Sequence, residues 1–196
     1  MRRSSSTRLR GGSLTARRSI PALIAERRLR ARVRAIGRQI RRDYRGKELV
    51  LVGVLKGSFI FMADLARSIG LPVACDFMKV SSYGKGTSSN GRLRFDFDVS
   101  RPLRGKHVLL VEDIVDTGYT AAKVLGRIRA RRPASVRLCS LLHKPARERV
   151  RVPIDYLGFT IPDRFVVGYG LDRDGLHRNL PYIGVMEDRG RSGKLS

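Results

Sequence analysis

Cysteine is scarce in this sequence, which contains only Cys75 and Cys139 among its 196 residues. The two thiols form no Cys-x-x-Cys or Cys/His pattern. Their placement argues against a disulfide scaffold and against a zinc site, and it fits a reducing cytosol. We expect both cysteines to lie in strands as unreactive core groups.

Long apolar stretches are also missing. The longest obvious apolar run, Leu49–Leu55, is far shorter than the ~20 residues that a membrane span needs. Residues 1–19 contain no apolar segment of the kind that marks a secretory signal. We therefore expect no membrane association and a cytoplasmic location, with an organelle left open by the composition of the first residues.

Acidic residues are few, because 17 Asp and Glu stand against 41 Lys and Arg, giving a formal net charge of +24. The excess is uneven: residues 1–47 hold 16 basic side chains and only Glu26 and Asp43 as acids. Such a surface can bind polyanions, including nucleic acid, and it also suits a protein with phosphate substrates. Compositional drift toward arginine without any function is the alternative.

The chain divides into a short extension and one folded domain. Residues 1–19 are rich in Arg, Ser and Gly, and we interpret them as a disordered basic extension, with a transit peptide as the alternative. Residues 20–196 have the length and the apolar content of a single domain with a real core.

Apolar periodicity predicts an α/β fold with a mainly parallel sheet. Leu29, Val33, Ile36 and Ile40 follow helical spacing, and the residues between them are mostly arginine. Downstream, short apolar runs typical of buried parallel strands alternate with helical segments. The expected strands cover residues 48–55, 73–80, 94–99, 107–111, 136–142, 154–159 and 165–170, and the later helices cover 58–69, capped by Ser58, and 120–131. Residues 81–92, rich in Gly and Ser, are predicted to form a long mobile loop of the functional kind.

One segment, VLLVEDIVDTGYT at residues 108–120, combines the end of an apolar strand with three carboxylates and a helix start. Ligands of open α/β sheets bind beyond the carboxyl ends of the strands, which is where Glu112, Asp113 and Asp116 are expected. The turn that follows offers backbone N–H groups and hydroxyls at the positive end of a helix dipole, which makes it a phosphate cradle. Gly118 permits a ligand to approach the backbone closely.

The three carboxylates would repel a bare phosphate, so they need another partner. Ribose hydroxyls or a divalent cation meet this need, since Mg²⁺ commonly bridges a carboxylate and a substrate phosphate. Helix capping alone would use one acid, and Glu112 with Asp113 at the end of an apolar strand is costly without a partner. The motifs GxxxxGK[ST] and GxGxxG are absent. The residues therefore predict a sugar-phosphate site.

The segment resembles the phosphoribosyl pyrophosphate signature of the type I phosphoribosyltransferases, and VEDIVDTG is similar in particular to the 6-oxopurine (hypoxanthine-guanine) enzymes. Further segments resemble the family in its order and spacing over about residues 23–187, and they look most like its bacterial members. These segments are Leu55–Ser58, Ser81–Gly84, Leu141–Lys144, Pro162–Asp172 and Arg178–Val185.

The resemblance implies a type I phosphoribosyltransferase fold, with a small hood subdomain formed by the N-terminal helix region and the segment after about residue 150. It implies a purine salvage enzyme that transfers 5-phosphoribosyl from phosphoribosyl pyrophosphate to hypoxanthine or guanine, giving IMP or GMP and pyrophosphate. It also implies Mg²⁺ as cofactor and assembly into a homodimer or homotetramer.

The resemblance also implies roles around the ribose and its phosphate. Glu112 and Asp113 would hold the ribose hydroxyls and, together with Asp172, the metal. Asp116 would be the catalytic base that takes a proton as the purine nitrogen attacks the anomeric carbon. Asp116 would also border the phosphoribosyl group, whose 5′-phosphate would be bound by Thr117, Gly118, Tyr119 and Thr120.

Pyrophosphate and purine would be bound by other segments. The implied pyrophosphate ligands are Lys56, Gly57, Ser82, Tyr83 and Arg178, and in the family the peptide bond before this lysine is often cis. The implied purine ligands are Lys144, Phe165, Val166 and Asp172. Lys144 would donate to the 6-oxygen and so disfavour adenine, Phe165 would stack on the base, and Val166 would offer backbone groups. Closure of the loop that carries Ser82 and Tyr83 would exclude water.

Three features depart from the family pattern, and several hypotheses stay open. His177 stands near a position that is often aromatic, the first helix is unusually rich in arginine, and the N-terminal extension lies outside the match. Tyr119 stands at a position that varies in the family and is sometimes lysine. A regulatory RNA-binding protein on the same fold is the alternative from another class, favoured by the basic charge. An enzyme that prefers xanthine or guanine is a third hypothesis, and binding of nucleic acid by the basic N-terminus is a further one.

Overall fold

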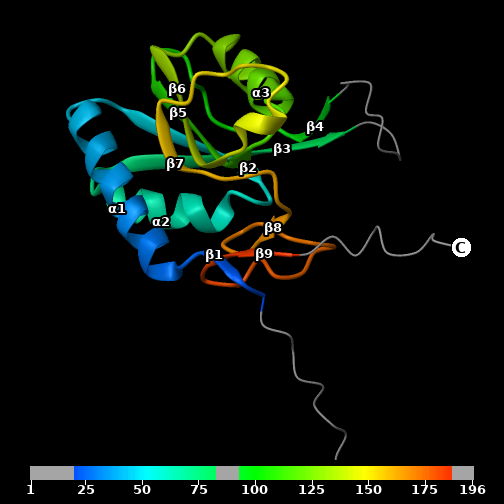
Figure 1. The fold of residues 1–196 in the computed structure, drawn as a ribbon. Helices are drawn as coiled ribbons and strands as arrows, with labels where there is room; N and C mark the ends of the chain where they lie inside the picture. Colours follow the sequence, from blue (N-terminus) through cyan, green and yellow to red (C-terminus); the bar gives the residue numbers. More distant parts are fainter. Residues whose placement is uncertain (1–19, 83–92, 187–196) are drawn as a thin grey trace, which may run out of the picture.

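The structure is a computed structural model that describes residues 20–82 and 93–186 (Figure 1). The predicted basic extension, residues 1–19, lies outside the described residues, as does most of the predicted loop, including Tyr83. Within the described ranges, no helix combines the length and the apolar character that crossing a bilayer requires.

The central element is a six-stranded sheet with the order β4-β3-β2-β5-β6-β7. Its strands are β2 (Leu49–Leu55), β3 (Val73–Ser82), β4 (Leu93–Phe97), β5 (His107–Val115), β6 (Ser135–His143) and β7 (Tyr156–Thr160). All neighbours are parallel except β3 and β4, which pair antiparallel at one edge. The predicted α/β fold with a mainly parallel sheet is confirmed.

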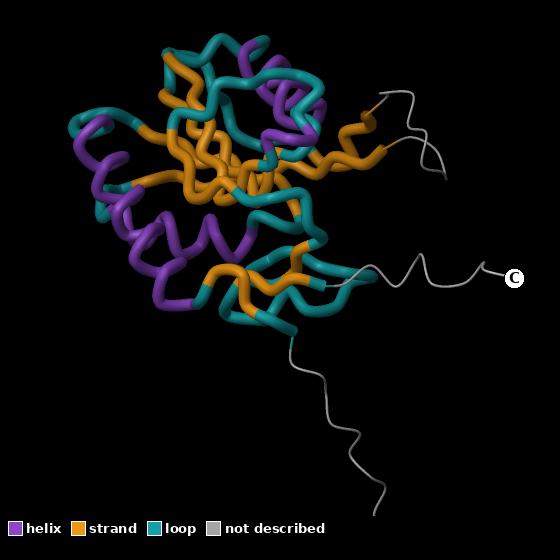
Figure 2. The backbone as a smooth tube through the Cα atoms, in the orientation of Figure 1, coloured by secondary structure: helices purple, strands orange, loops and turns teal. Residues whose placement is uncertain are grey.

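Helices cover both faces of this sheet, as Figures 1 and 2 show. One face carries α1 (Glu26–Asp43) and α2 (Phe59–Ile69), and the other carries α3 (Tyr119–Arg129). A single turn of 3₁₀ helix, η1 (Pro145–Arg147), follows β6. The sheet is therefore the middle layer of three.

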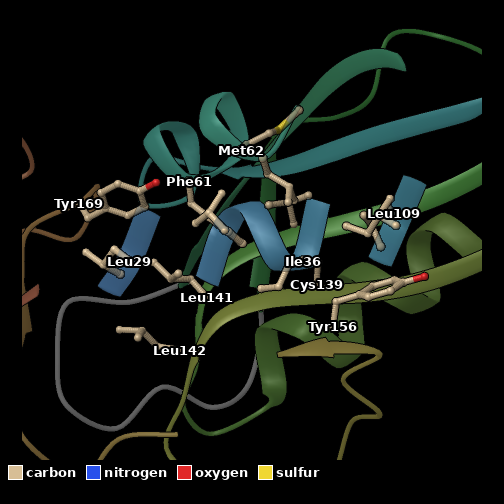
Figure 3. Packing of buried hydrophobic residues seen from close by; sticks show 14 of the residues in the cluster. Leu29, Ile36, Phe61, Met62, Leu109, Cys139, Leu141, Leu142, Tyr156 and Tyr169 are labelled. Atoms are coloured by element: carbon tan, nitrogen blue, oxygen red, sulfur yellow. The ribbon is translucent and has the colours of Figure 1, made fainter. Parts of the chain in front are cut away.

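Strand β2 shows why the sequence has continuous apolar runs. Successive side chains of a strand point to opposite faces, so Leu49 and Leu51 join the core beneath α1 and α2, whereas Val50 and Val52 join the core beneath α3. Figure 3 shows the first of these cores, in which side chains from α1, α2 and the strands pack together. Because both faces are buried, no polar alternation remains in the sequence.

Helix α1 has the amphipathic character that its spacing predicts. All four residues of the predicted apolar stripe are buried, and the arginines of the helix are exposed. At Gly37 an added Cβ would lie 2.6 Å from Cβ of Ser68 in α2, so the two helices touch almost backbone to backbone. This contact fixes the separation of α1 and α2.

A second, small sheet joins the two ends of the described chain. β1 (Ala22–Ile24) pairs antiparallel with β9 (Ile183–Val185), and β9 pairs antiparallel with β8 (Val166–Val167). The strand predicted for residues 165–170 is thus only two residues long, because Gly168, Tyr169 and Gly170 adopt positive φ and leave the extended conformation. The three-residue strands β1 and β9 were not predicted.

The strand that carries the acids is longer than predicted. β5 continues to Val115 because β6 pairs with it as far as the Val115–His143 register. Glu112 and Asp113 therefore lie within the strand and do not follow it.

Two smaller expectations are only partly met. Ser58 stands at the N-cap position of α2 as predicted, but its hydroxyl donates to the Val54 carbonyl at 2.7 Å and makes no capping hydrogen bond to the helix. Cys139 is buried as expected, but Cys75 is exposed. Its neighbours on the same face of β3, Val73 and Phe77, are only partly buried, since the α1–α2 layer covers this strand incompletely.

Candidate active site

A cavity of about 360 Å³ opens at the ends of the adjacent parallel strands β2 and β5. The pairing of these two strands brings the loop after β2 against the segment that sequence analysis singled out. The lining residues are Val54, Leu55, Gly57, Glu112, Asp113, Ile114, Val115, Asp116, Thr117, Gly118, Thr120 and Ala121. Parallel strands end at the same edge of a sheet, and that edge is where ligands of such folds bind.

The loop after β2 packs directly against the acidic pair. The Leu55–Lys56 peptide bond is cis, as the family resemblance led us to expect. An added Cβ at Gly57 would lie 1.5 Å from Oδ2 of Asp113, so a side chain there would displace the Asp113 carboxylate. On the other side, an added Cβ at Gly170 would lie 2.0 Å from the Gly57 carbonyl oxygen. The loop is therefore held between Asp113 and the segment that follows β8, and the Lys56 side chain is exposed.

Glu112 is buried beside Asp113, and hydrogen bonds satisfy only some of the oxygens of these two carboxylates. Glu112 is 4% exposed, and its Oε1 has no hydrogen-bond partner among the described residues. Burial raises the pKa of Glu112 well above its ordinary value, and the charge of Asp113 raises it further. Burial also raises the pKa of Asp113 to about 6, against the lowering effects of the Ile114 N–H and the Arg178 guanidinium. Such a pair is ready for a cation or for hydroxyl donors.

The third predicted metal ligand, Asp172, is engaged elsewhere. Its Oδ1 lies 2.6 Å from Nη2 of Arg178, and its Oδ2 accepts from the Gly175 N–H at 2.7 Å. Within residues 20–82 and 93–186, no group of three or more His, Cys, Asp or Glu is arranged to hold a metal by itself. The unpartnered oxygen of Glu112 beside Asp113 suits a Mg²⁺ ion that takes further oxygens from a substrate.

The turn between β5 and α3 is tightly built. Gly118 has φ +84°, and an added Cβ would lie 1.9 Å from the Val150 carbonyl oxygen. The Thr117 carbonyl accepts from the N–H groups of Arg149 and Val150, both at 3.0 Å. Thr117, Gly118 and Thr120 line the cavity at the N-terminus of α3, where N–H groups have no partner within the helix. The Tyr119 side chain is exposed and does not line the cavity.

Asp116 and Lys144 are joined through two residues that sequence analysis missed. Nε of Arg147 lies 2.8 Å from Oδ1 of Asp116. Oδ1 of Asp163 lies 3.7 Å from Nη1 of Arg147 and 3.8 Å from Nζ of Lys144. Asp163 lies within the family-like segment Pro162–Asp172, and Arg147 lies three residues after Leu141–Lys144, yet nothing in a one-dimensional pattern pairs the two residues.

Lys144 is buried beside the end of β5. The side chain is 9% exposed, and its backbone N–H donates to the Val115 carbonyl at 3.0 Å. The parallel register of β5 and β6 places this residue at the same edge of the sheet as Asp116.

The segment around β8 borders the site from the small sheet. Phe165 is 41% exposed, and the guanidinium carbon of Arg173 lies 5.6 Å from the centre of its ring. Val166 is buried and pairs with Val185 of β9. Arg178 donates from Nη1 to the Gly170 carbonyl at 2.6 Å. Ser82 ends β3 next to the undescribed loop.

Comparison with known proteins agrees with this geometry. The family model of the phosphoribosyl transferase domain matches residues 22–174. The chain is 50% identical over 174 residues to the hypoxanthine phosphoribosyltransferase of Haemophilus influenzae, covering 86% of this chain and 97% of that one. It is 46% identical over 173 residues to the hypoxanthine-guanine phosphoribosyltransferase of Mycobacterium avium, covering 85% of each. The crystal structure of a hypoxanthine phosphoribosyltransferase from Staphylococcus aureus superposes with a TM-score of 0.83 at 41% identity, covering 88% of this chain and 94% of that one.

Proposed function

The chain belongs to the phosphoribosyltransferase family, among the hypoxanthine(-guanine) enzymes of purine salvage, and on that basis we propose the reaction and the residues that carry it. The protein transfers 5-phosphoribosyl from phosphoribosyl pyrophosphate to hypoxanthine or guanine, giving IMP or GMP and pyrophosphate. The observation that carries the proposal is the buried pair Glu112–Asp113, with an unpartnered oxygen, beside the N-terminus of α3 in one cavity.

The sugar phosphate binds across that cavity. Its 5′-phosphate lies at the N-terminus of α3, where Thr117, Gly118 and Thr120 line the cavity and can donate to an anion through backbone N–H groups and hydroxyls. Its ribose hydroxyls donate to Glu112 and Asp113, which removes the penalty for burying these carboxylates unpaired.

The acidic pair also fits Mg²⁺, which would be held by Glu112 and Asp113 together with substrate oxygens. Bound there, the ion would neutralise negative charge on the pyrophosphate leaving group. Asp172, which pairs with Arg178, would reach the ion directly or through water. Arg178 would bind pyrophosphate together with Lys56, the Gly57 backbone and the Ser82–Tyr83 loop.

Asp116 activates the purine as a base, and Lys144 recognises its 6-oxygen. As a purine imidazole nitrogen attacks the anomeric carbon, the bond from that carbon to the pyrophosphate oxygen breaks. Asp116 receives the proton that the purine loses. Lys144 donates to the 6-oxygen, whereas the amino group of adenine would meet it donor to donor. Phe165 stacks on the base, and Val166 presents backbone groups to the 2-position.

The decisive assay offers purified protein phosphoribosyl pyrophosphate and Mg²⁺ with hypoxanthine, guanine, xanthine, adenine or uracil in parallel. We expect turnover of hypoxanthine and guanine that is lost on addition of EDTA, regained with Mg²⁺ and sharply reduced in Asp116→Asn. Folded protein that turns over none of the five bases would sink the proposal. The same assay ranks xanthine against guanine.

Assembly and location complete the proposal. We expect a homodimer or homotetramer in the cytoplasm. Light scattering after size-exclusion chromatography gives the assembly, and a monomer at micromolar concentration would exclude it. No contact in the described residues favours the RNA-binding alternative.

A further inference from the structure

Four charged side chains of alternating sign run from one predicted purine contact to the other. They are Asp116, Arg147, Asp163 and Lys144, joined by contacts of 2.8, 3.7 and 3.8 Å. We propose that Arg147 and Asp163 are positioning residues of the purine site, which set the geometry between the base Asp116 and the donor Lys144. The inference rests on the proposed function and deepens it.

The backbone around Arg147 supports this role, because it is bonded to both residues that flank Asp116. The Lys144 N–H donates to the Val115 carbonyl, and the N–H groups of Arg149 and Val150 donate to the Thr117 carbonyl, all at 3.0 Å. The segment 144–150 is thus clamped onto the Asp116 turn on both sides. Its one side-chain ion pair to that turn runs, in the described residues, from Arg147 to Asp116.

The arrangement has a chemical consequence for the base. Oδ1 of Asp116 lies 2.8 Å from Nε of Arg147 but makes no hydrogen bond within the described residues. The ion pair therefore orients the carboxylate and leaves its oxygens able to accept the purine proton. Asp163 lies between the two cations, 3.8 Å from Nζ of Lys144 and 3.7 Å from Nη1 of Arg147, and so couples the positions of these two side chains. One rigid purine ring must meet both the acceptor and the donor, so an error in these positions affects both contacts.

The variants Arg147→Ala, Arg147→Lys and Asp163→Asn test the inference, with Arg151→Ala as the control. Arg151 is an exposed arginine that directly follows the segment 144–150 and has no ion pair in the described residues. We expect Arg147→Ala to lower kcat with hypoxanthine by about 10- to 100-fold, since a misplacement near 1 Å costs ~10²-fold. The KM for phosphoribosyl pyrophosphate should stay within about twofold, a split that general loss of structure would not produce.

The remaining measurements test whether Arg147 and Asp163 act by positioning Asp116 and Lys144. Arg147→Lys should keep part of the kcat that Arg147→Ala loses, and guanidinium added to Arg147→Ala should restore part of it. Asp163→Asn should raise the KM for hypoxanthine. Arg147→Ala that matches Arg151→Ala, or that turns over faster than wild type, would overturn the inference and make Arg147 an occluding residue. Wild-type protein that is inactive with every base would instead overturn the proposed function.

A separate observation concerns the groove between α1 and α2, which has a volume of about 450 Å³. It shares no lining residue with the cavity at β5. Four arginines surround it, together with one carboxylate, a serine, a valine and a tyrosine. These residues are Arg30, Arg34, Arg38, Arg67, Asp64, Ser68, Val33 and Tyr169.

The charges of this groove are only partly compensated. Arg30 pairs with Glu26, and Arg67 pairs with Asp64. No ion pair joins Arg34 or Arg38 to an acid in the part of the chain that the structure describes. These two guanidinium groups stand one helical turn apart on one wall, and guanidinium forks match phosphate oxygens. We infer that the groove binds a small anion with two or more phosphate groups.

The groove is also connected to the catalytic loop. The Tyr169 hydroxyl donates to Oδ2 of Asp64 at 2.6 Å, and Arg67 contacts the other oxygen of the same carboxylate. The next residue, Gly170, packs on the Gly57 carbonyl. An anion that draws Arg67 away from Asp64 would therefore alter the Tyr169–Asp64 hydrogen bond. Tyr169 is the neighbour of Gly170, which packs on the active-site loop at Gly57.

Titration calorimetry with inorganic triphosphate tests this site. The double variant Arg34→Ala/Arg38→Ala is compared with Arg41→Ala/Arg42→Ala, which removes the same charge from the same helix outside the groove. Wild type should show two binding events, one of them at the catalytic cavity. We expect the first variant to lose one event, with affinity down by at least tenfold, and the control to keep both. Equal isotherms for the two variants would show that only net charge attracts the anion and would overturn the site.

Discussion

Gly57 offers the sharpest test of the catalytic geometry, because an alanine there has a defined obstacle. The added Cβ would lie 1.5 Å from Oδ2 and 2.4 Å from Cγ of Asp113, whereas ordinary contact begins at 3.4 Å. Asp113 or the loop must therefore move by about 2 Å. Gly57 does not have positive φ, so the substitution adds no backbone strain.

Gly57→Ala should lose most of its activity but little of its stability. A misplacement near 1 Å costs ~10²-fold in rate, so we expect kcat/KM for phosphoribosyl pyrophosphate to fall by at least about 10²-fold. The obstacle is the end of a side chain, and alanine also restricts the unfolded chain, so the free energy of unfolding should change by less than ~1 kcal/mol.

Steady-state kinetics and urea denaturation measure the two quantities on the same preparation. Gly126→Ala is the matched control, because Gly126 lies in α3 with open space around an added Cβ. That variant should keep full activity and gain about 0.5–1 kcal/mol. A Gly57→Ala enzyme within threefold of wild type would refute the argument that Asp113 must stay where the loop holds it.

Three further predictions follow from other contacts. Gly118→Ala should lower the free energy of unfolding by about 2–4 kcal/mol in urea denaturation, because positive φ and the Val150 carbonyl both oppose a side chain; a loss below ~1 kcal/mol would contradict this. In EDTA without substrate, Glu112→Gln should raise Tm, and the rise should grow as pH increases above 4.5. Burial raises the pKa of Glu112 in the folded state above its unfolded value, so ionisation of Glu112 destabilises the wild type, whereas a glutamine at this position does not ionise. A difference in Tm that does not change with pH would contradict this prediction. Tyr156→Phe should lower the free energy of unfolding by about 1–2 kcal/mol, because the Tyr156 hydroxyl forms hydrogen bonds with Asp43 at 2.6 Å and Arg137 at 2.7 Å. Thermal unfolding measures this loss, and an unchanged Tm would show that Asp43 and Arg137 pair equally well without the hydroxyl.

The layered fold was predictable because its signal is local. Strands buried on both faces appear as apolar runs such as Leu49–Leu55, and α1 appears as a single apolar stripe among arginines. β1 and β9 escaped because three residues carry no usable period, and their pairing depends on residues at the opposite end of the domain. Cys75 was misjudged because alternation fixes the face of a strand but not how far a helix layer extends over it.

The candidate site was predictable where one segment holds several functional groups. Residues 112–120 supply carboxylates, a tight turn and a helix start in nine consecutive positions, and the structure gathers most of them in one cavity. The contact between Arg147 and Asp116 escaped because it forms between separate segments through space. The same holds for the steric need for glycine at position 118, since the Val150 carbonyl that would meet a side chain there belongs to a separate segment.

The small sheet constrains the order in which the protein can mature during translation. β1 leaves the ribosome early, but its partner β9 is among the last segments to be made, so β1 must wait for nearly the whole domain. The strands and helix around Glu112 and Asp113 precede residue 144 and can fold first. The segment with Phe165 and Val166 gains its partner only when β9 arrives. A nascent chain would thus complete the strand and helix around its acidic pair before the small sheet, and premature termination before Ile183 would leave Phe165 and Val166 without the strand that pairs with them.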